Sequence, residues 1–399
     1  LLVLVYTDFS PFEKIKKFYD YANNEFTVTE RLLTQSRVII YYISLIIFPH
    51  PSRLNLDYDY ALSHSLIDPI TTILAFGAIC GLIAAAVYFA KKERLISFCV
   101  LWFFGTHLIE SSILPLAIIF EHRNYLPSMM VSLIPVVLAY RYIKLDWIKI
   151  GLLSVLVIGL SVSTYQRNRV WEDKITLWSD VVKKSPGKAR PHFNLGAAFS
   201  EQKRDAEAIP LYQRALEINP DLAQPHINLG EALQRQNQIE EAAEHYRAAL
   251  QIKPDLPEAH NNVGSILAKQ GRTEEAIQFY KNALKIRPHY ALAHFNLART
   301  LIENGRIEEG IRHYYQAIHF KPKYAEAHNN LGSIFLNSGE TEKAIKHYIA
   351  ALQIDPNLVE AYNNLGNALM QEGKIEAAIK QFQKAIQFNP GFITAENNL

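Results

Sequence analysis

Residues 325–358 read AEAHNNLGSIFLNSGETEKAIKHYIAALQIDPNL, and this 34-residue stretch decides the fold of the C-terminal half of the chain. The same apolar and small residues return at the same places in neighbouring stretches. A fixed period of this length indicates a repeat array with two helices in each unit. Small residues such as Gly230 let the paired helices approach closely, Tyr246 fills the gap between them, and Pro254 ends the second helix. The prolines that mark the period are Pro186, Pro220, Pro254, Pro288, Pro322, Pro356 and Pro390.

The repeated units resemble tetratricopeptide repeats, which stack helix pairs into an α-solenoid. Ala298 and Gly310 depart mildly from the shared pattern, and neither departure is expected to break the array. Residues 393–399 match the start of a seventh unit, so the last complete repeat is expected to lack a polar capping helix and the chain to be cut short there. The six full units are residues 189–222, 223–256, 257–290, 291–324, 325–358 and 359–392.

The first 165 residues are of a different kind and predict part of a multi-span, all-α membrane domain. Residues 70–90 carry no charge over 21 positions, enough to cross a hydrocarbon core of about 30 Å at about 1.5 Å per residue. The other apolar runs are shorter, so interfacial or re-entrant helices stay open as alternatives for them. Residues 1–6 resemble the tail of another span, and an upstream segment is therefore expected. The apolar runs are residues 38–48, 70–90, 95–109, 127–140 and 150–163.

Basic residues in short loops predict the orientation of this domain, because such loops stay on the cytoplasmic side. The basic loops at residues 91–94 and 141–149 are two spans apart, so both are expected to be cytoplasmic. The last span then places the repeats on the extracytoplasmic side of a membrane such as the bacterial inner membrane. Residues 166–188 are expected to form an adaptor helix whose apolar face packs under the first full repeat. That face is formed by Trp171, Ile175, Trp178 and Val182.

The composition argues against several classes of function. The formal net charge of +2 and the 49% hydrophobic content average over two unlike halves. Cys80 and Cys99 both fall in predicted spans, so a disulfide framework or a cysteine metal site is not expected. Acidic and basic residues are nearly balanced along the repeats, and without a basic stripe nucleic acid is not an expected partner. No metal site is predicted. The histidines that recur with the repeat are assigned to helix packing: His226, His260, His294 and His328.

One asparagine recurs in every repeat, on the helix face opposite to the one that packs inward, and this stripe is expected to be concave. Asparagine is a poor residue for the middle of a helix, but its amide offers two donors and an acceptor that suit the backbone of an extended peptide. The sequence therefore predicts that the array binds protein through these amides. The alternative is that asparagine is simply common at this place in such repeats. The asparagine ladder is Asn194, Asn228, Asn262, Asn296, Asn330 and Asn364.

Polar residues beside the predicted spans form a second candidate site, because ionisable groups near a membrane are costly and often functional. A guanidinium can bind a lipid phosphate through two hydrogen bonds, and a carboxylate can orient a sugar hydroxyl or take its proton. This chemistry fits a lipid-linked sugar donor. The alternative is plain anchoring, with arginines reaching the lipid headgroups and acids solvated in loops. The candidates are Arg37, Asp57, Asp59, Glu121, His122, Arg123 and Tyr125.

Three features resemble the transmembrane and tetratricopeptide repeat-containing protein O-mannosyltransferases and their bacterial relatives. They are EHRNYLPS at residues 121–128, ERLLTQSR at residues 30–37 followed by Pro49 and DYDY at residues 57–60, and a membrane part that precedes repeats. The resemblance implies a C-superfamily membrane glycosyltransferase that uses a polyprenyl-phosphate-linked sugar as donor. In that family the key acids lie in the first outward loop, which would precede Leu1, so no catalytic residue is assigned.

These features together predict a glycosyltransferase whose solenoid recruits an unfolded or extended acceptor protein, with membrane lipid as a second partner. A membrane-anchored scaffold without enzymatic activity is the alternative. Polysaccharide assembly or export, with repeats that recruit other enzymes, shares the same lipid-phosphate chemistry and also stays open.

Overall fold

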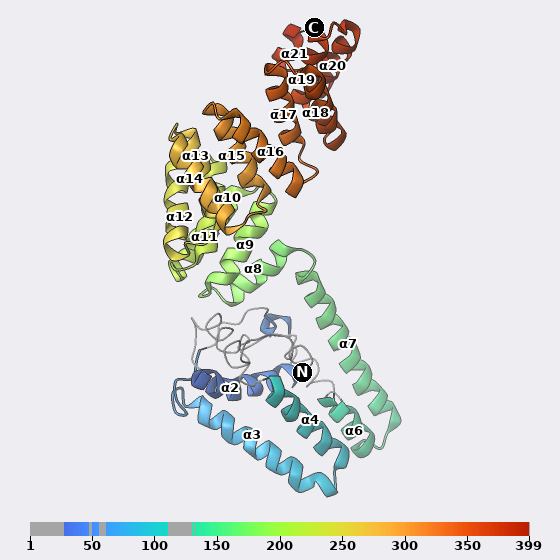
Figure 1. The fold of residues 1–399 in the computed structure, drawn as a ribbon. Coiled ribbons are helices and arrows are strands. Elements are labelled where there is room, and N and C mark those ends of the chain that lie inside the picture. The colour runs from blue at the N-terminus through green and yellow to red at the C-terminus, as the bar shows by residue number, and fades with distance from the viewer. Residues whose placement is uncertain (1–27, 48–49, 56–60, 111–129, 132, 399) are drawn as a thin grey trace, which may run out of the picture. The chain divides into compact units, whose positions relative to one another are not determined.

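The computed structural model describes residues 28–47, 50–55, 61–110, 130–131 and 133–398, and the regular elements among them are helices (Figure 1). The chain divides into two compact units, residues 1–218 and 219–399. The first unit contains the apolar N-terminal helices and the first repeat, and the second unit contains the other repeats.

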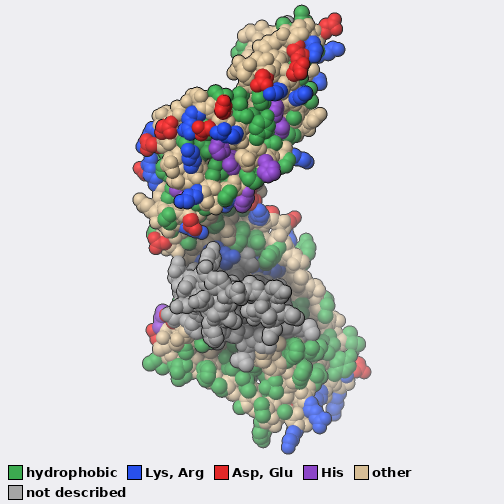
Figure 2. Space-filling view, viewed as in Figure 1, with side chains coloured by type: hydrophobic (Ala, Val, Ile, Leu, Met, Phe, Trp, Pro, Cys, Tyr) green, Lys and Arg blue, Asp and Glu red, His purple; other side chains and the backbone are tan. Residues whose placement is uncertain are grey.

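The predicted apolar runs coincide with helices wherever the structure describes them. Two stretches, Thr71–Lys91 and Asp146–Val170, are long and apolar enough to cross a membrane. Their large apolar side chains are uncovered: Leu74 is 65% exposed and Val157 is 61% exposed. Figure 2 shows this as apolar surface over the N-terminal helices. Two of the other apolar helices are shorter, so a multi-span domain stays a prediction. The helices are α2 (Val28–Ile47), α3 (Thr71–Tyr88), α4 (Arg94–Glu110), α6 (Leu133–Tyr142) and α7 (Asp146–Val170).

Contacts among these helices position their ends. Val38, Tyr42 and Phe103 form a buried apolar cluster between α2 and α4. Arg141, near the end of α6, pairs with Glu93, which lies just before α4. The two basic loops of the sequence therefore lie at the same end of the apolar helices.

The expected adaptor region contains the end of α7 and a separate short helix, α8 (Lys174–Lys184). Asp173 caps α8, because its carboxylate accepts hydrogen bonds from two backbone N–H groups of the first turn at 2.8 and 2.9 Å. The predicted apolar face is wrong for Trp171. This residue lies in the break after α7 and is 49% exposed, whereas Val181 is the fully buried side chain of α8.

A polar latch ties α8 to the short segment after α2. The Lys184 ammonium donates to the Asp180 carboxylate at 2.6 Å and to the backbone oxygen of Leu54 at 2.7 Å. Beside it, the Asn55 amide donates to the Ser185 hydroxyl at 2.8 Å, and both of these side chains are buried. Within the first unit, the latch thus connects α8, the helix that precedes the first repeat, with the apolar helices.

Each of the six predicted repeats folds as two helices, here called helix A and helix B. The first repeat consists of α9 (Ala189–Glu201) and α10 (Asp205–Ile218). The next two repeats are α11 (Ala223–Arg235) with α12 (Ile239–Ile252) and α13 (Pro257–Lys269) with α14 (Thr273–Ile286). They are followed by α15 (Ala291–Glu303) with α16 (Ile307–Phe320), α17 (Ala325–Asn337) with α18 (Thr341–Ile354) and α19 (Val359–Gln371) with α20 (Ile375–Phe388). The predicted seventh unit begins with α21 (Ile393–Asn398).

Close contact of helix A with helix B requires one glycine in each repeat. A Cβ atom at Gly332 would lie 2.6 Å from Cε1 of the buried Tyr348 ring, which leaves no room for alanine. The fourth repeat reverses this arrangement. Its helix A carries Ala298, and a Cβ atom at Gly310 on helix B would lie 2.9 Å from the Ala298 backbone oxygen. The two departures from the repeat pattern compensate each other, and both helices of this repeat are intact, as expected.

Candidate functional site

The structure describes only one of the donor-side candidates. The Arg37 guanidinium donates to the backbone oxygen of Ala61 at 3.0 Å and to the Ser63 hydroxyl at 3.2 Å, so it holds the segment that precedes α3. The remaining candidates of this group lie outside the described residues: Asp57, Asp59, Glu121, His122, Arg123 and Tyr125. Within the described residues no group of three or more metal-binding side chains occurs.

The asparagine ladder lies on helix A of each repeat, where the sequence places it. Asn194 belongs to the first unit, and the other five asparagines belong to the second. Their side chains are half-buried, and that of Asn296 is buried. We call the surface that contains the five asparagines of the second unit the ladder face.

Amide-to-amide hydrogen bonds join successive repeats of the second unit along the ladder face. Asn296 donates from Nδ2 to Oδ1 of Asn261 at 2.9 Å, and Asn364 donates to Asn329 at 3.1 Å. Asn398, the equivalent residue of the seventh unit, donates to Asn363 at 2.9 Å. Each acceptor stands 35 residues earlier, directly before the ladder asparagine of the preceding repeat. These acceptors were not predicted, although the Asn-Asn pairs in the sequence mark them.

A ladder asparagine bonds elsewhere when the preceding repeat has an apolar residue at the acceptor place. Asn330 follows a repeat with Phe295 at this place, and it donates to the Tyr314 hydroxyl at 3.1 Å. Asn262 donates to the Glu231 carboxylate at 3.2 Å. The ladder therefore has a structural task in linking repeats. Since an amide has two N–H donors and one acceptor, a single such bond leaves part of its capacity for a bound chain.

Polar groups surround the N-terminal part of the ladder face in the second unit. Burial raises the pKa of Glu231, and the hydrogen bond from Asn262 opposes this rise. Burial also raises the pKa of Tyr290 to about 12, so its hydroxyl is neutral at pH 7. Glu258 pairs with Arg287 at 2.7 Å. This part of the surface offers hydroxyl and amide donors beside a paired carboxylate.

The fourth repeat gives the ladder face an apolar part. Phe295 stacks on Tyr324 with ring centroids 4.9 Å apart. Leu292, one turn before Asn296 on the same helix face, is 41% exposed. The ladder face therefore combines amides with apolar side chains, as a surface that binds protein does.

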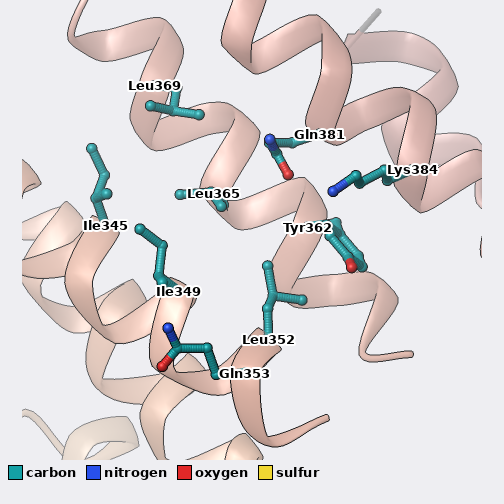
Figure 3. A pocket seen from close by; sticks show the side chains of 9 residues that line it. All are labelled: Ile345, Ile349, Leu352, Gln353, Tyr362, Leu365, Leu369, Gln381 and Lys384. Atoms are coloured by element: carbon teal, nitrogen blue, oxygen red, sulfur yellow. The ribbon is translucent and has the colours of Figure 1, made fainter. Parts of the chain in front are cut away.

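An apolar groove of about 360 Å³ lies between α18, α19 and α20 (Figure 3). Leu365 and Leu369 line its floor, and Gln381 and Lys384 line one side. Thirty-four residues earlier, the places of Ile349, Leu369 and Gln381 are taken by larger rings, which contact one another at centroid distances of 5.4 to 6.0 Å. The groove thus results from smaller side chains at these three places. The corresponding rings are Tyr315, Phe335 and His347.

Family models identify the C-terminal array. Models described as TPR repeat match residues 199–237, 235–271 and 332–373. Models described as tetratricopeptide repeat match residues 267–329 and 359–392. These residues therefore form tetratricopeptide repeats, as the period of the sequence predicts. No curated protein matches the chain in sequence.

Solved structures with similar repeats share little sequence with this chain. The structure of Cut9 with Hcn1, from the APC/C, is 15% identical, covers 79% of this chain and 58% of that chain, and has a TM-score of 0.52. PilF of Pseudomonas aeruginosa is 18% identical over 52% of this chain and 95% of its own, with a TM-score of 0.48. YrrB, described as a TPR protein with an unusual peptide-binding site, is 22% identical over 47% and 96% of the two chains, with a TM-score of 0.38. Cut9 supports an α-solenoid fold for the array.

Proposed function

We propose that the repeats hold an extended segment of a partner protein along the ladder face, and that the apolar N-terminal helices attach this scaffold to a membrane. The amides of the ladder carry the proposal, because they recur at the 34-residue period and keep hydrogen-bonding capacity beyond their bonds to neighbouring repeats. The apolar part around Leu292 and Phe295 supplies a surface for side chains of the partner.

The proposed membrane attachment is supported by the exposure of two helices. Thr71–Lys91 and Asp146–Val170 leave their apolar side chains uncovered, whereas a core helix of a water-soluble domain would cover them. Burial in lipid is the arrangement that removes this apolar surface from water. Repeats on the extracytoplasmic side follow as the proposed orientation, from the positions of the basic loops.

Photo-crosslinking at the ladder face tests the proposal directly. A photoreactive phenylalanine analogue replaces Leu292, and a matched control replaces Tyr315, a helix B residue of the same repeat with 45% exposure. The probe is a reduced, alkylated polypeptide that cannot fold. We expect crosslinks at residue 292 that exceed those at residue 315. Equal crosslinking at the two positions would exclude the ladder face as the binding surface.

Asparagine variants separate binding from stability. Alanine at Asn296 and Asn364 removes two ladder amides, whereas alanine at Asn261 and Asn329 removes only the acceptors of these two amides. If both sets lower stability alike, loss of probe binding only in the first set supports a direct role of the ladder.

Transfer of a sugar from a polyprenyl-phosphate donor is the second candidate function and rests on the sequence resemblance. In the described part of this site, Arg37 is engaged with the segment at residues 61–63. The scaffold proposal accounts for more of the described residues than the transferase proposal does. In the intact protein, loss of glycosylated product after Glu121→Ala or Asp57→Ala, with normal membrane insertion, would support transferase activity.

A further inference from the structure

The histidines of helix A have a defined tautomer. The Nε2 atom of His260 lies 2.9 Å from the backbone oxygen of Pro254, and that of His294 lies 3.0 Å from the backbone oxygen of Pro288. A carbonyl oxygen only accepts hydrogen bonds, so the imidazole proton lies on Nε2 and Nδ1 presents a lone pair. In these repeats, the helix A histidine is therefore an acceptor at Nδ1.

In three repeats the Nδ1 atom of the helix A histidine lies within hydrogen-bond distance of a second histidine, 19 residues later on helix B. The Nδ1 atoms are 2.9 Å apart in two of these pairs and 3.1 Å apart in the third. One ring must donate and the other accept at this distance, so the contact tolerates one proton between the two Nδ1 atoms and excludes two. The pairs are His226 with His245, His294 with His313, and His328 with His347.

In other repeats the helix B position of the pair is not a histidine. His260 contacts Phe279, with ring centroids 5.7 Å apart, and its buried Nδ1 has no hydrogen-bond partner among the described residues. His192, which stands 19 residues before Leu211, also has a buried Nδ1 without a partner in the part of the chain that the structure describes. In the last full repeat, Tyr362 and Gln381 replace the pair. The chain therefore contains natural substitutes for the paired histidines.

The pairs differ in their charged surroundings but share their partial burial. Burial, with the neighbouring imidazole as a second cause, lowers the pKa of His313 and of His347 to about 4. Burial also lowers the pKa of His226 and of His294. The charged groups that act on the pairs are Glu241 and Glu244 for His245, and Lys281, Glu309 and Arg312 for His313. The rings of Tyr315 and Phe335 contact His347.

We propose that the three histidine pairs form an acid-sensitive switch that opens the contact of helix A with helix B in three repeats as the pH falls below about 6. Unfolded histidines bind protons below a pKa of about 6.5, whereas the folded pairs resist them, so the unfolded state binds more protons in this range. Stability is therefore fully present above pH 6.5 and is lost as the pH falls toward 4. One ring or both rings of each pair are only partly buried, so solvent protons have access to the pairs.

The test compares the full chain in detergent with a variant that carries the natural substitute at every pair. His226, His294 and His328 become Tyr, and His245, His313 and His347 become Gln, as in Tyr362 and Gln381. Denaturant unfolding of the repeats is followed by circular dichroism at pH 7.5 and pH 4.5. We expect acid to shift the folding equilibrium of the native chain by at least 100-fold more than that of the variant, because two pKa units correspond to about 100-fold for one group.

Equal acid sensitivity of the two chains would overturn the proposal. If the full variant does not fold, variants with one substituted pair each are compared with the native chain in the same way. The two remaining pairs are then the same in both chains. Nitrogen-15 chemical shifts of the histidine rings provide an independent measurement. Protonation of both rings of a pair near pH 6.5, without loss of helix packing, would also refute the switch.

Discussion

At the scale of single residues, the contact of helix A with helix B depends on a glycine, which lacks the methyl group of alanine, at the point of closest approach. We predict that Gly332→Ala destabilises the fold by about 1 to 3 kcal/mol, because the new Cβ atom would overlap the buried Tyr348 ring. The measurement is the free energy of unfolding in urea. The control is Gly339→Ala, a turn position with a φ of 79° where the added atom meets no neighbour, so any loss there reports backbone strain alone.

Ala298 and Gly310 make the same contact testable as an exchange. We expect Gly310→Ala alone to destabilise the fourth repeat, because the new Cβ atom would lie 2.9 Å from the Ala298 backbone oxygen and 2.5 Å from Ile302 Cδ1. Ala298→Gly added to it should recover part of the loss, since other repeats combine glycine on helix A with alanine on helix B. A double-mutant cycle in urea measures this recovery. Strict additivity of the two changes would show that the positions do not compensate.

The amide bonds between repeats are a second feature of single residues. We predict that Asn329→Ala lowers the free energy of unfolding by about 1 kcal/mol, because the Asn364 amide loses its acceptor in a half-buried place. Asn364→Ala in the same background should then cost less than it does in the native chain. Urea unfolding of the two single variants and the double variant gives the coupling. A coupling of zero would contradict the bond.

At the scale of elements, the polar latch connects α8 with the apolar helices. Asp180 accepts hydrogen bonds from Arg167 at 3.1 Å and from Lys184 at 2.6 Å, and Arg167 is buried. We predict that Asp180→Asn lowers the free energy of unfolding by about 1 to 3 kcal/mol, because it removes the charge of the half-buried carboxylate that pairs with the buried Arg167 guanidinium. Protease resistance of the segment between α7 and α9 measures the local opening. Asp221→Asn, at an exposed position between repeats, is the matched control and should leave this resistance unchanged.

The helices of the repeats could be predicted from the sequence, whereas several contacts between them could not. Helices were predicted because the apolar spacing of each repeat is local and fixed by the 34-residue period. The partners of the ladder asparagines were missed, since they lie 35 residues away and depend on how one repeat rotates against the next. Trp171 was placed on the adaptor helix by its spacing alone, but the chain breaks there because α7 ends and Asp173 starts a new helix. The donor-side residues other than Arg37 fall outside the described part of the chain.

At the scale of the whole molecule, the proposed orientation can be tested with cysteine labels. We predict that a membrane-impermeant maleimide labels Glu342→Cys in intact cells, whereas Lys92→Cys reacts only after the membrane is permeabilised. Both positions are exposed on the protein, so access depends on the side of the membrane. Cys80 is replaced by Ala in both chains, because it is exposed in the structure. Labelling of both positions without permeabilisation would contradict a membrane between them.

The bonds between ladder asparagines also bear on how such an array can grow or shrink during evolution. Because the donor asparagine and its acceptor belong to successive repeats, one repeat supplies only one partner of each hydrogen bond. Loss of residues 291–324 by unequal recombination would remove Asn296 and place Asn330 after Asn261, so one donor replaces another and the number of amide bonds is kept. Loss of residues 325–358 would place Asn364 after Phe295 and remove one bond. Deletions of different whole units are therefore not equivalent, because they leave different numbers of hydrogen bonds between repeats.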